Sequence, residues 1–194
     1  MLNLNELISI NLLNTDKNSI HSYIDYFYES NFSNYRSLPV VLIELGVQYG
    51  GSIKLWDLYF ENCEIYALDT EVQNRAFEKF CKGKDNIHYV IGDAYTNHIA
   101  NEIPEFDIFI EDGSHSLKDQ MSAIKLYLPK LKDSGIFIIE DIQEYNELNI
   151  LKNYTQSLYS GYIFEYIDLR IVKYRYDDLM LVIKKENTNV NSIN

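Results

Sequence analysis

Two acidic clusters each follow a short apolar run, and this arrangement indicates a metal site. Glu111–His115 follows Phe106–Ile110, and Glu140–Asp141 follows Gly135–Ile139. In an open α/β sheet, ligands bind in the crevice outside the carboxyl ends of parallel strands, so two such clusters on consecutive strands would converge there. Converging carboxylate oxygens are typical ligands of a hard divalent cation.

His115 adds a side chain that titrates near neutrality. It lies three residues after Asp112 and could act as a general base beside the metal. A structural role near the start of the following helix is the alternative. The position of His115 next to the acidic clusters favours catalysis.

Composition limits the class of protein. The chain has 194 residues, 46% of them hydrophobic, which suits one domain with a full-sized core. The net charge of −12 and the lack of a basic stripe argue against nucleic-acid and anionic-membrane partners. Cys63 and Cys81 lack metal-ligand spacing, and neither a leader nor an apolar run of about 18 residues is visible. We therefore expect a single soluble, cytoplasmic domain over residues 1–194, with a disordered polar tail at 186–194.

Short apolar runs alternate with helical patterns, as in a parallel sheet covered on both faces. The expected strands are Val40–Glu44, Glu64–Leu68, Ile87–Ile91, Phe106–Ile110, Gly135–Ile139, Phe164–Asp168 and Leu179–Lys184. The expected helices are Ser19–Ser30, Gly51–Phe60, Val72–Cys81, Ser116–Leu131 and Glu144–Leu158.

The last two expected strands are joined by an irregular link of ten residues. A link this short has no room for a crossover helix, so these strands should form an antiparallel pair. The predicted fold class is therefore α/β, with a Rossmann-like, mostly parallel seven-stranded sheet, a terminal antiparallel hairpin and helices on both faces. This expected arrangement resembles the class I methyltransferase fold more than the plain dinucleotide-binding fold.

A glycine-rich loop follows the first expected strand and opens the first helix. Its residues Gly46, Gly50, Gly51 and Ser52 suit a cofactor that lies over the strand end, because glycine permits a close backbone approach. A tight turn without a ligand is the structural alternative.

Three acids at successive strand ends favour a bound cofactor. Asp69 lies 23 residues after Gly46, where an acid accepts hydrogen bonds from ribose hydroxyls. Asp93 could orient an adenine amino group. Glu44 lies inside its strand end and would suit the cationic sulfonium or ammonium of S-adenosylmethionine better than the pyrophosphate of NAD.

The segment before the first strand, residues 1–38, is expected to form a helical lid. For Asp16, Lys17, His21 and Tyr23, helix capping competes with a position over the cofactor. Lys17 and Tyr23 are kept as cofactor-binding candidates, and Glu111 joins them.

Along nearly its whole length, the chain resembles the metal-dependent sugar O-methyltransferases of the macrolide-antibiotic type and the related cephalosporin-hydroxylase-like methyltransferases. The resemblance implies that Asp112, Glu140 and Asp141 hold magnesium, with His115 as the base. Relatives often carry Asp where this chain has Glu111, and they have a large N-terminal region that this chain lacks. The motifs that carry the resemblance are Thr15-Asp16-Lys17 with His21 and Tyr23, Glu44–Trp56 with Tyr59-Phe60, Asp69, Gly92-Asp93, Asp112–His115, Gly135 with Glu140-Asp141, Asp168–Arg170 and Arg175–Asp178.

The predicted function is methyl transfer from S-adenosylmethionine to a hydroxyl of a sugar, glycan or natural-product precursor, with Mg²⁺ or another hard divalent cation. Asp112 and His115 are the predicted catalytic residues. Two alternatives stay open: a catalytically silent methyltransferase-like subunit, and an NAD(P)-dependent oxidoreductase, against which the G-x-x-x-G-G spacing of the loop argues. The acceptor and the oligomeric state, including a homo-oligomer, stay open as well.

Overall fold

We analysed a computed structural model of the chain, which describes residues 1–71 and 81–186. The expected helix Val72–Cys81 lies almost entirely outside these ranges, as does the expected disordered tail beyond Glu186. Among the described residues, no helix is both long and apolar enough to cross a membrane.

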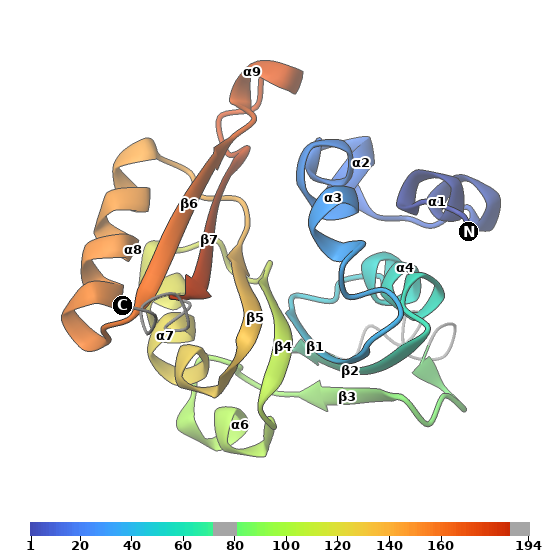
Figure 1. Cartoon of the computed structure of the whole chain (residues 1–194), viewed down its shortest axis with the longest axis horizontal. Coiled ribbons are helices and arrows are strands. Elements are labelled where there is room, and N and C mark those ends of the chain that lie inside the picture. Colours follow the sequence, from blue (N-terminus) through green and yellow to red (C-terminus); the bar gives the residue numbers. More distant parts are fainter. Residues whose placement is uncertain (72–80, 187–194) are drawn as a thin grey trace, which may run out of the picture.

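A seven-stranded sheet forms the centre of the molecule, in the order β3-β2-β1-β4-β5-β7-β6 (Figure 1). The first five strands along the chain pair in parallel, and β7 is antiparallel to both β5 and β6. The predicted fold class is therefore confirmed. The strands are β1 (Pro39–Leu45), β2 (Asn62–Asp69), β3 (Ile87–Ile91), β4 (Phe106–Glu111), β5 (Leu131–Ile139), β6 (Tyr162–Asp168) and β7 (Leu179–Lys185).

Apolar side chains cover both faces of the central strands because side chains alternate along a strand. One core contains Leu42, Ile110 and Ile138 and packs against the N-terminal helices and α4 (Gly51–Tyr59). The other contains Ile43 and Phe109 and packs against α6 (Asn97–Glu102), α7 (Leu117–Tyr127) and α8 (Tyr145–Leu158).

The N-terminal segment differs from its prediction. The expected single helix Ser19–Ser30 is replaced by α2 (Asp16–Ser19), a π-helical turn (Ile24–Tyr28) and α3 (Glu29–Phe32). The break at residues 20–22 places His21 against Asp178, so a tertiary contact overrides the helical pattern. An additional helix, α1 (Leu4–Asn11), begins at a capping box of Asn3 and Glu6 that the sequence analysis did not use.

Two further differences are local. The helix expected to reach Leu131 ends at Tyr127 and is followed by a 3-10 turn, Leu128–Lys130, because Pro129 has no backbone N–H to continue the α-helical hydrogen bonds. The link between β6 and β7 contains a short helix, α9 (Arg170–Lys173), which projects beyond the sheet beside the N-terminal helices (Figure 1).

Candidate active site

The carboxyl ends of β1, β4 and β5 bring four acidic residues together. Glu44 lies near the end of β1, Asp112 directly follows β4, and Glu140 and Asp141 directly follow β5. Backbone hydrogen bonds continue past the strand ends, from the amide of Asp112 to the Leu45 carbonyl (3.1 Å) and from the amide of Glu140 to the Glu111 carbonyl (3.0 Å). The register of the sheet therefore fixes the backbone positions of Asp112 and Glu140.

Lys17 lies beneath the acids, although the sequence assigned it to the cofactor. Its Nζ atom contacts Asp112 Oδ2 at 2.7 Å, forms an ion pair with Glu140, and lies 3.7 Å from Glu44 Oε1. The other oxygen of Glu140 accepts a hydrogen bond from the Tyr28 hydroxyl. Both oxygens of Glu140 thus bind residues of the N-terminal segment. Lys17 does not line the cleft that lies over the carboxyl ends of β1, β2 and β4.

Asp141 lies among three side chains, one of which is His21, with its Nδ1 atom 3.6 Å from Asp141 Oδ1. The Tyr23 hydroxyl donates a hydrogen bond to Asp141 Oδ1 (2.6 Å), and His115 Nε2 lies 3.9 Å from Asp141 Oδ2. Tyr23 therefore supports the acid cluster and does not line the cleft. Asp141 and His115 both have a left-handed backbone conformation, with φ of 52° and 56°. This conformation is costly for residues other than glycine and is concentrated at functional sites.

Asp112, His115 and Asp141 form a donor set that fits a divalent cation. One ligand atom from each residue lies within 4.8 Å of the others. The buried Nδ1 of His115 has no hydrogen-bond partner in the described part of the chain. Two carboxylates and an imidazole match the ligand chemistry of such ions. Of the three predicted metal ligands, Asp112 and Asp141 belong to this set, whereas Glu140 faces Lys17 and Tyr28.

Burial raises the pKa values of the clustered acids. It is the main cause for Glu44, Glu140 and Asp141, and the negative charge of Asp112 adds to the increase in each. Lys17 opposes the effect at Glu44 and Glu140. Burial disfavours the charged form of a carboxyl group, so a nearby cation is needed to keep these groups ionised.

Glu111 is buried behind the cleft and does not line it. Its Oε1 atom accepts a hydrogen bond from the Tyr95 hydroxyl (2.6 Å), which in turn accepts one from the Ser114 amide (3.1 Å). Burial raises the pKa of Glu111 to about 7. Tyr95 thus connects Glu111 to the segment that carries His115.

A cleft of about 360 Å³ lies over the carboxyl ends of β1, β2 and β4. This volume is within the usual range for a small-molecule site. Four of the predicted cofactor residues line it, Gly46, Gly51, Ser52 and Asp69, whereas Gly50 and Asp93 are not part of the wall. Gly50 is the N-cap residue of α4 and has a left-handed conformation. The neighbours of Asp93, Gly92 and Ala94, do line the cleft, as do Asn14–Asp16 and Asp112–His115.

Two glycines permit close backbone crossings at the cleft. A Cβ atom on Gly46 would lie 1.8 Å from the Asp112 carbonyl oxygen, and one on Gly51 would lie 1.8 Å from the Asn14 carbonyl oxygen. Such distances are incompatible with a side chain. Gly51 therefore allows the N-terminal segment to cross the start of α4.

Two of the predicted cofactor acids already have partners within the protein. Asp69 Oδ2 accepts hydrogen bonds from the amides of Val47 and Gln48, both at 3.0 Å, and so holds the glycine loop. Glu44 Oε2 accepts one from Trp56 Nε1 at 2.6 Å. Glu44 is buried and does not line the cleft.

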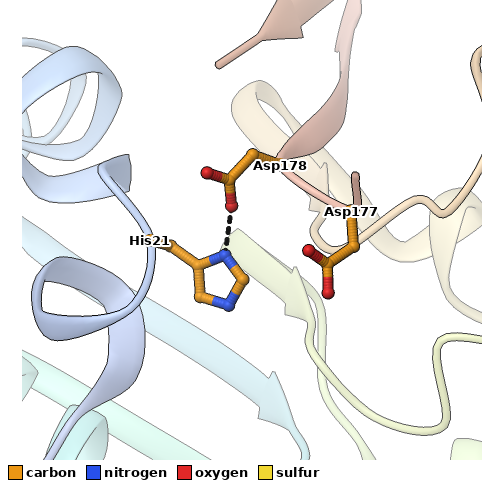
Figure 2. A group of neighbouring side chains, drawn as sticks. All are labelled: His21, Asp177 and Asp178. Atoms are coloured by element: carbon orange, nitrogen blue, oxygen red, sulfur yellow. Dashed lines mark hydrogen bonds and ion pairs between the residues drawn. The ribbon is translucent and has the colours of Figure 1, made fainter. Parts of the chain in front are cut away.

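A second group of acids lies beside Asp141 (Figure 2). His21 faces Asp178 and bonds to it through Nδ1, and Asp177 lies across from the same ring. Arg175 pairs with Asp177 at 2.6 Å. The bond between His21 and Asp178 joins the N-terminal segment to the residues just before β7. Arg170 forms a further ion pair with Asp168 at 2.7 Å.

Sequence reasoning missed several contributors to the site. Tyr28, Tyr95, Trp56 and Asn14 had no individual role assigned. A tyrosine or tryptophan carries no local sequence signal that its polar atom will meet a buried carboxylate. The pairing of strand ends decides such contacts.

Comparison with known proteins supports the class that this fold and site define. No family model matches the chain. A tetracenomycin-C rhamnosyl 3'-O-methyltransferase of Streptomyces olivaceus is 31% identical over 139 residues, which is 66% of this chain and 34% of the relative. Demethylmacrocin O-methyltransferase of Streptomyces fradiae is 31% identical over 150 residues, which is 72% of this chain and 36% of the relative. The chain thus spans about a third of the length of these curated relatives.

Solved structures give the same fold. The mycinamycin-pathway methyltransferase MycE, solved with Mg and SAH, superposes with a TM-score of 0.75 at 22% identity, over 100% of this chain and 57% of that one. The chain is therefore a protein of the class I methyltransferase fold. Within this class, its curated homologues are sugar O-methyltransferases, and the resemblance inferred from the motifs is confirmed.

Proposed function

We propose that this chain is an S-adenosylmethionine-dependent, Mg²⁺-dependent O-methyltransferase that acts on a sugar hydroxyl. One observation carries the proposal: the segment Asp112–His115 lines the cofactor cleft and also contributes two donors to the cluster that contains Asp141. A cofactor bound in the cleft and an acceptor bound at the acids would therefore both contact this segment and lie next to each other.

In this proposal, Asp112 and Asp141 hold the divalent cation, with His115 next to it. The ion, when bound, would lower the pKa of an acceptor hydroxyl by Lewis-acid polarisation. Tyr23 fixes the orientation of Asp141 through its hydrogen bond. Glu140 supports the site from beneath through Lys17 and Tyr28.

His115 accepts the proton of the acceptor hydroxyl in this proposal. Its side chain is 34% exposed, so a substrate can reach the imidazole. Asp141, 3.9 Å from Nε2, stabilises the protonated ring. Ser116, and not His115, provides the N-terminal cap of α7, because its side chain accepts the Asp119 amide. This arrangement leaves His115 without a capping role.

The glycine loop and Asp69 bind the cofactor in this proposal. S-adenosylmethionine carries an activated methyl group, so the main contribution of the protein is alignment of nucleophile and methyl. Buried Glu44, beneath Gly46 and beside Trp56, supplies negative charge near the loop.

The acceptor class comes from the relatives. Their names describe glycosylated natural products, and MycE was also solved with mycinamycin VI. We therefore favour the sugar of a glycosylated small molecule over a precursor of polysaccharide biosynthesis. The cytoplasmic location and the absence of nucleic-acid partners stay predictions from the sequence, and the oligomeric state stays open.

Calorimetry and a methyl-transfer assay test the proposal. S-adenosylhomocysteine should bind more tightly than NAD, and Asp69→Ala should weaken it. Chelation should abolish methyl transfer to a glycoside acceptor, and Mg²⁺ should restore it. Preferential NAD binding would support an oxidoreductase. Tight S-adenosylhomocysteine binding with no divalent-ion binding would instead support a catalytically silent subunit.

A further inference from the structure

Lys17 is an unusual residue to find within an acid cluster because its side chain is only 1% exposed. Isolated buried ammonium groups are costly, and they persist where carboxylates compensate them. Here Asp112 and Glu140 contact Nζ directly, and Glu44 lies 3.7 Å away. Within residues 1–71 and 81–186, no other lysine or arginine forms an ion pair with these three acids.

The backbone fixes this position of the ammonium. Thr15 caps α2 by accepting the Lys17 amide. The preceding residue, Asn14, crosses Gly51 so closely that no Cβ would fit there. Thr15 and Asp16 then form part of the cleft wall. Lys17 is thus delivered to the acids by a tightly packed crossing and is not a mobile surface side chain.

The charge balance explains why an ammonium is needed. Carboxylate oxygens of Asp112, Glu140 and Glu44 surround the buried ammonium of Lys17, so little water lies between its charge and the three acids. Its positive charge therefore compensates acids that come from three different strand ends. The same charge lies beside Asp112, one of the residues proposed to hold the divalent ion, and two cations close together repel each other.

We propose that Lys17 is a built-in counter-cation, which stabilises the acid cluster without a divalent ion and weakens the binding of that ion. The first part rests on the structure alone. The second part rests also on the proposed function, because it assumes that Asp112 and Asp141 bind the ion. Lys17 would then set the affinity of the site and would not be a ligand or a catalytic residue.

The test compares Lys17→Met, which removes the charge and keeps much of the length, with Lys132→Met as the control. Lys132 pairs with the single acid Asp107 and is 39% exposed. In EDTA, we expect Lys17→Met to lower the melting temperature by more than about 5 °C and Lys132→Met to change it by less than about 2 °C. In Mg²⁺ the deficit of Lys17→Met should shrink. Titration calorimetry with Mg²⁺ alone should show binding about 10-fold tighter or more in Lys17→Met.

Other outcomes separate the ideas. A folded Lys17→Met protein that binds Mg²⁺ more weakly, or equally well, would overturn the proposed effect on affinity and make Lys17 a brace for the ligands. An unchanged melting temperature in EDTA would overturn the stabilising role. If neither Lys17→Met nor Lys17→Gln folds even in Mg²⁺, an ion does not substitute for the ammonium and the proposal is wrong. If the parent protein binds no Mg²⁺, the proposed function fails, while the EDTA comparison still decides the first part.

Discussion

His115 combines three properties that a structural histidine rarely shares. Its backbone is left-handed, its Nε2 atom faces Asp141, and its side chain is partly exposed at the cleft. Strain of this kind is retained where the surrounding structure enforces it, often at functional sites. At the scale of single residues, the chemistry of the proposed site therefore depends most directly on this imidazole.

We expect His115→Ala to lower kcat by about 10²–10⁴-fold, the usual contribution of a positioned base, while the affinity for S-adenosylhomocysteine changes little. His98→Ala is the matched control because His98 is 84% exposed on α6. Single-turnover methyl transfer and thermal melting should be measured together. A His115→Ala protein that melts early but reacts at the parent rate would show that the residue is structural.

Helix α4 connects the cofactor loop to both the N-terminal segment and β3. Its first residue, Gly51, contacts Asn14, and Asp57 near its end binds Lys54, Lys84 and Asn86. At the scale of elements, the start of α4 thus fixes one wall of the cleft through backbone packing. The other end of α4 is stabilised by the charge of Asp57. These two contacts can be tested separately.

Gly51→Ala tests the crossing at the start of α4. Alanine normally stabilises a helix relative to glycine by up to about 1 kcal/mol. Here the new Cβ atom would lie 1.8 Å from the Asn14 carbonyl oxygen and would displace Asn14–Asp16. We expect a loss of stability and about 10-fold or greater weakening of S-adenosylhomocysteine binding, measured by melting and calorimetry. Stability equal to or above that of the parent would contradict the observed crossing.

Asp57 predicts a dependence of stability on pH. Burial alone would raise the pKa of Asp57, but hydrogen bonds from Lys54, Lys84 and Asn86 lower it below its ordinary value. Because the pKa of Asp57 is lower in the folded state, the ionised Asp57 stabilises the fold at pH values above the unfolded-state pKa. This stabilisation is lost as pH falls through the folded-state pKa. The partners Lys54 and Lys84 are 22% and 42% exposed, so screening limits the contribution to about 1 kcal/mol.

Urea unfolding of the parent and of Asp57→Asn should be compared between pH 7 and pH 3. At pH 7 the parent should be more stable than Asp57→Asn, and this difference in the free energy of unfolding should become smaller towards pH 3. Glu61→Gln, a change at an exposed acid two residues beyond α4, is the control and should show no such convergence. A constant difference across this range would show that Asp57 acts through packing and not through its charge.

At the scale of the whole molecule, the two proposed binding regions share the segment Asp112–His115. The cleft uses the glycine loop, β2 and the N-terminal crossing, whereas the acid cluster uses β4, β5 and helices before β1. Residues from the first 28 positions contact both regions. Ligand binding at either region should therefore stabilise the complete fold and not a separate part of it.

We expect S-adenosylhomocysteine at about 100 times its Kd to add about 2.7 kcal/mol of stability, which corresponds to a rise in melting temperature of about 5–10 °C for a chain of this size. Mg²⁺ should add a separate increment. NAD at the same concentration is the control and should have little effect. Equal stabilisation by NAD would contradict the cofactor assignment.

The sequence by itself determined the strands, their mostly parallel arrangement with a terminal antiparallel hairpin, and the position of both acidic clusters. The apolar runs before the two acidic clusters, at the ends of β4 and β5, are buried on both faces, and an acid that follows such a run can only emerge at the carboxyl edge. The glycine spacing and Asp69 likewise marked the cleft. These features depend on local patterns and on one general rule of α/β sheets.

Only the tertiary structure decided which acids face one another and what lies between them. Lys17 was expected at the cofactor and lies beneath the acids, Tyr23 supports Asp141, and Glu140 faces Lys17 and Tyr28. The N-terminal segment is separated from the acids by about 100 residues, so no local pattern specifies the pairing. The path of that segment across Gly51 and the twist of the sheet set these distances, and a buried charge then pairs with whichever opposite charge the packing brings within reach.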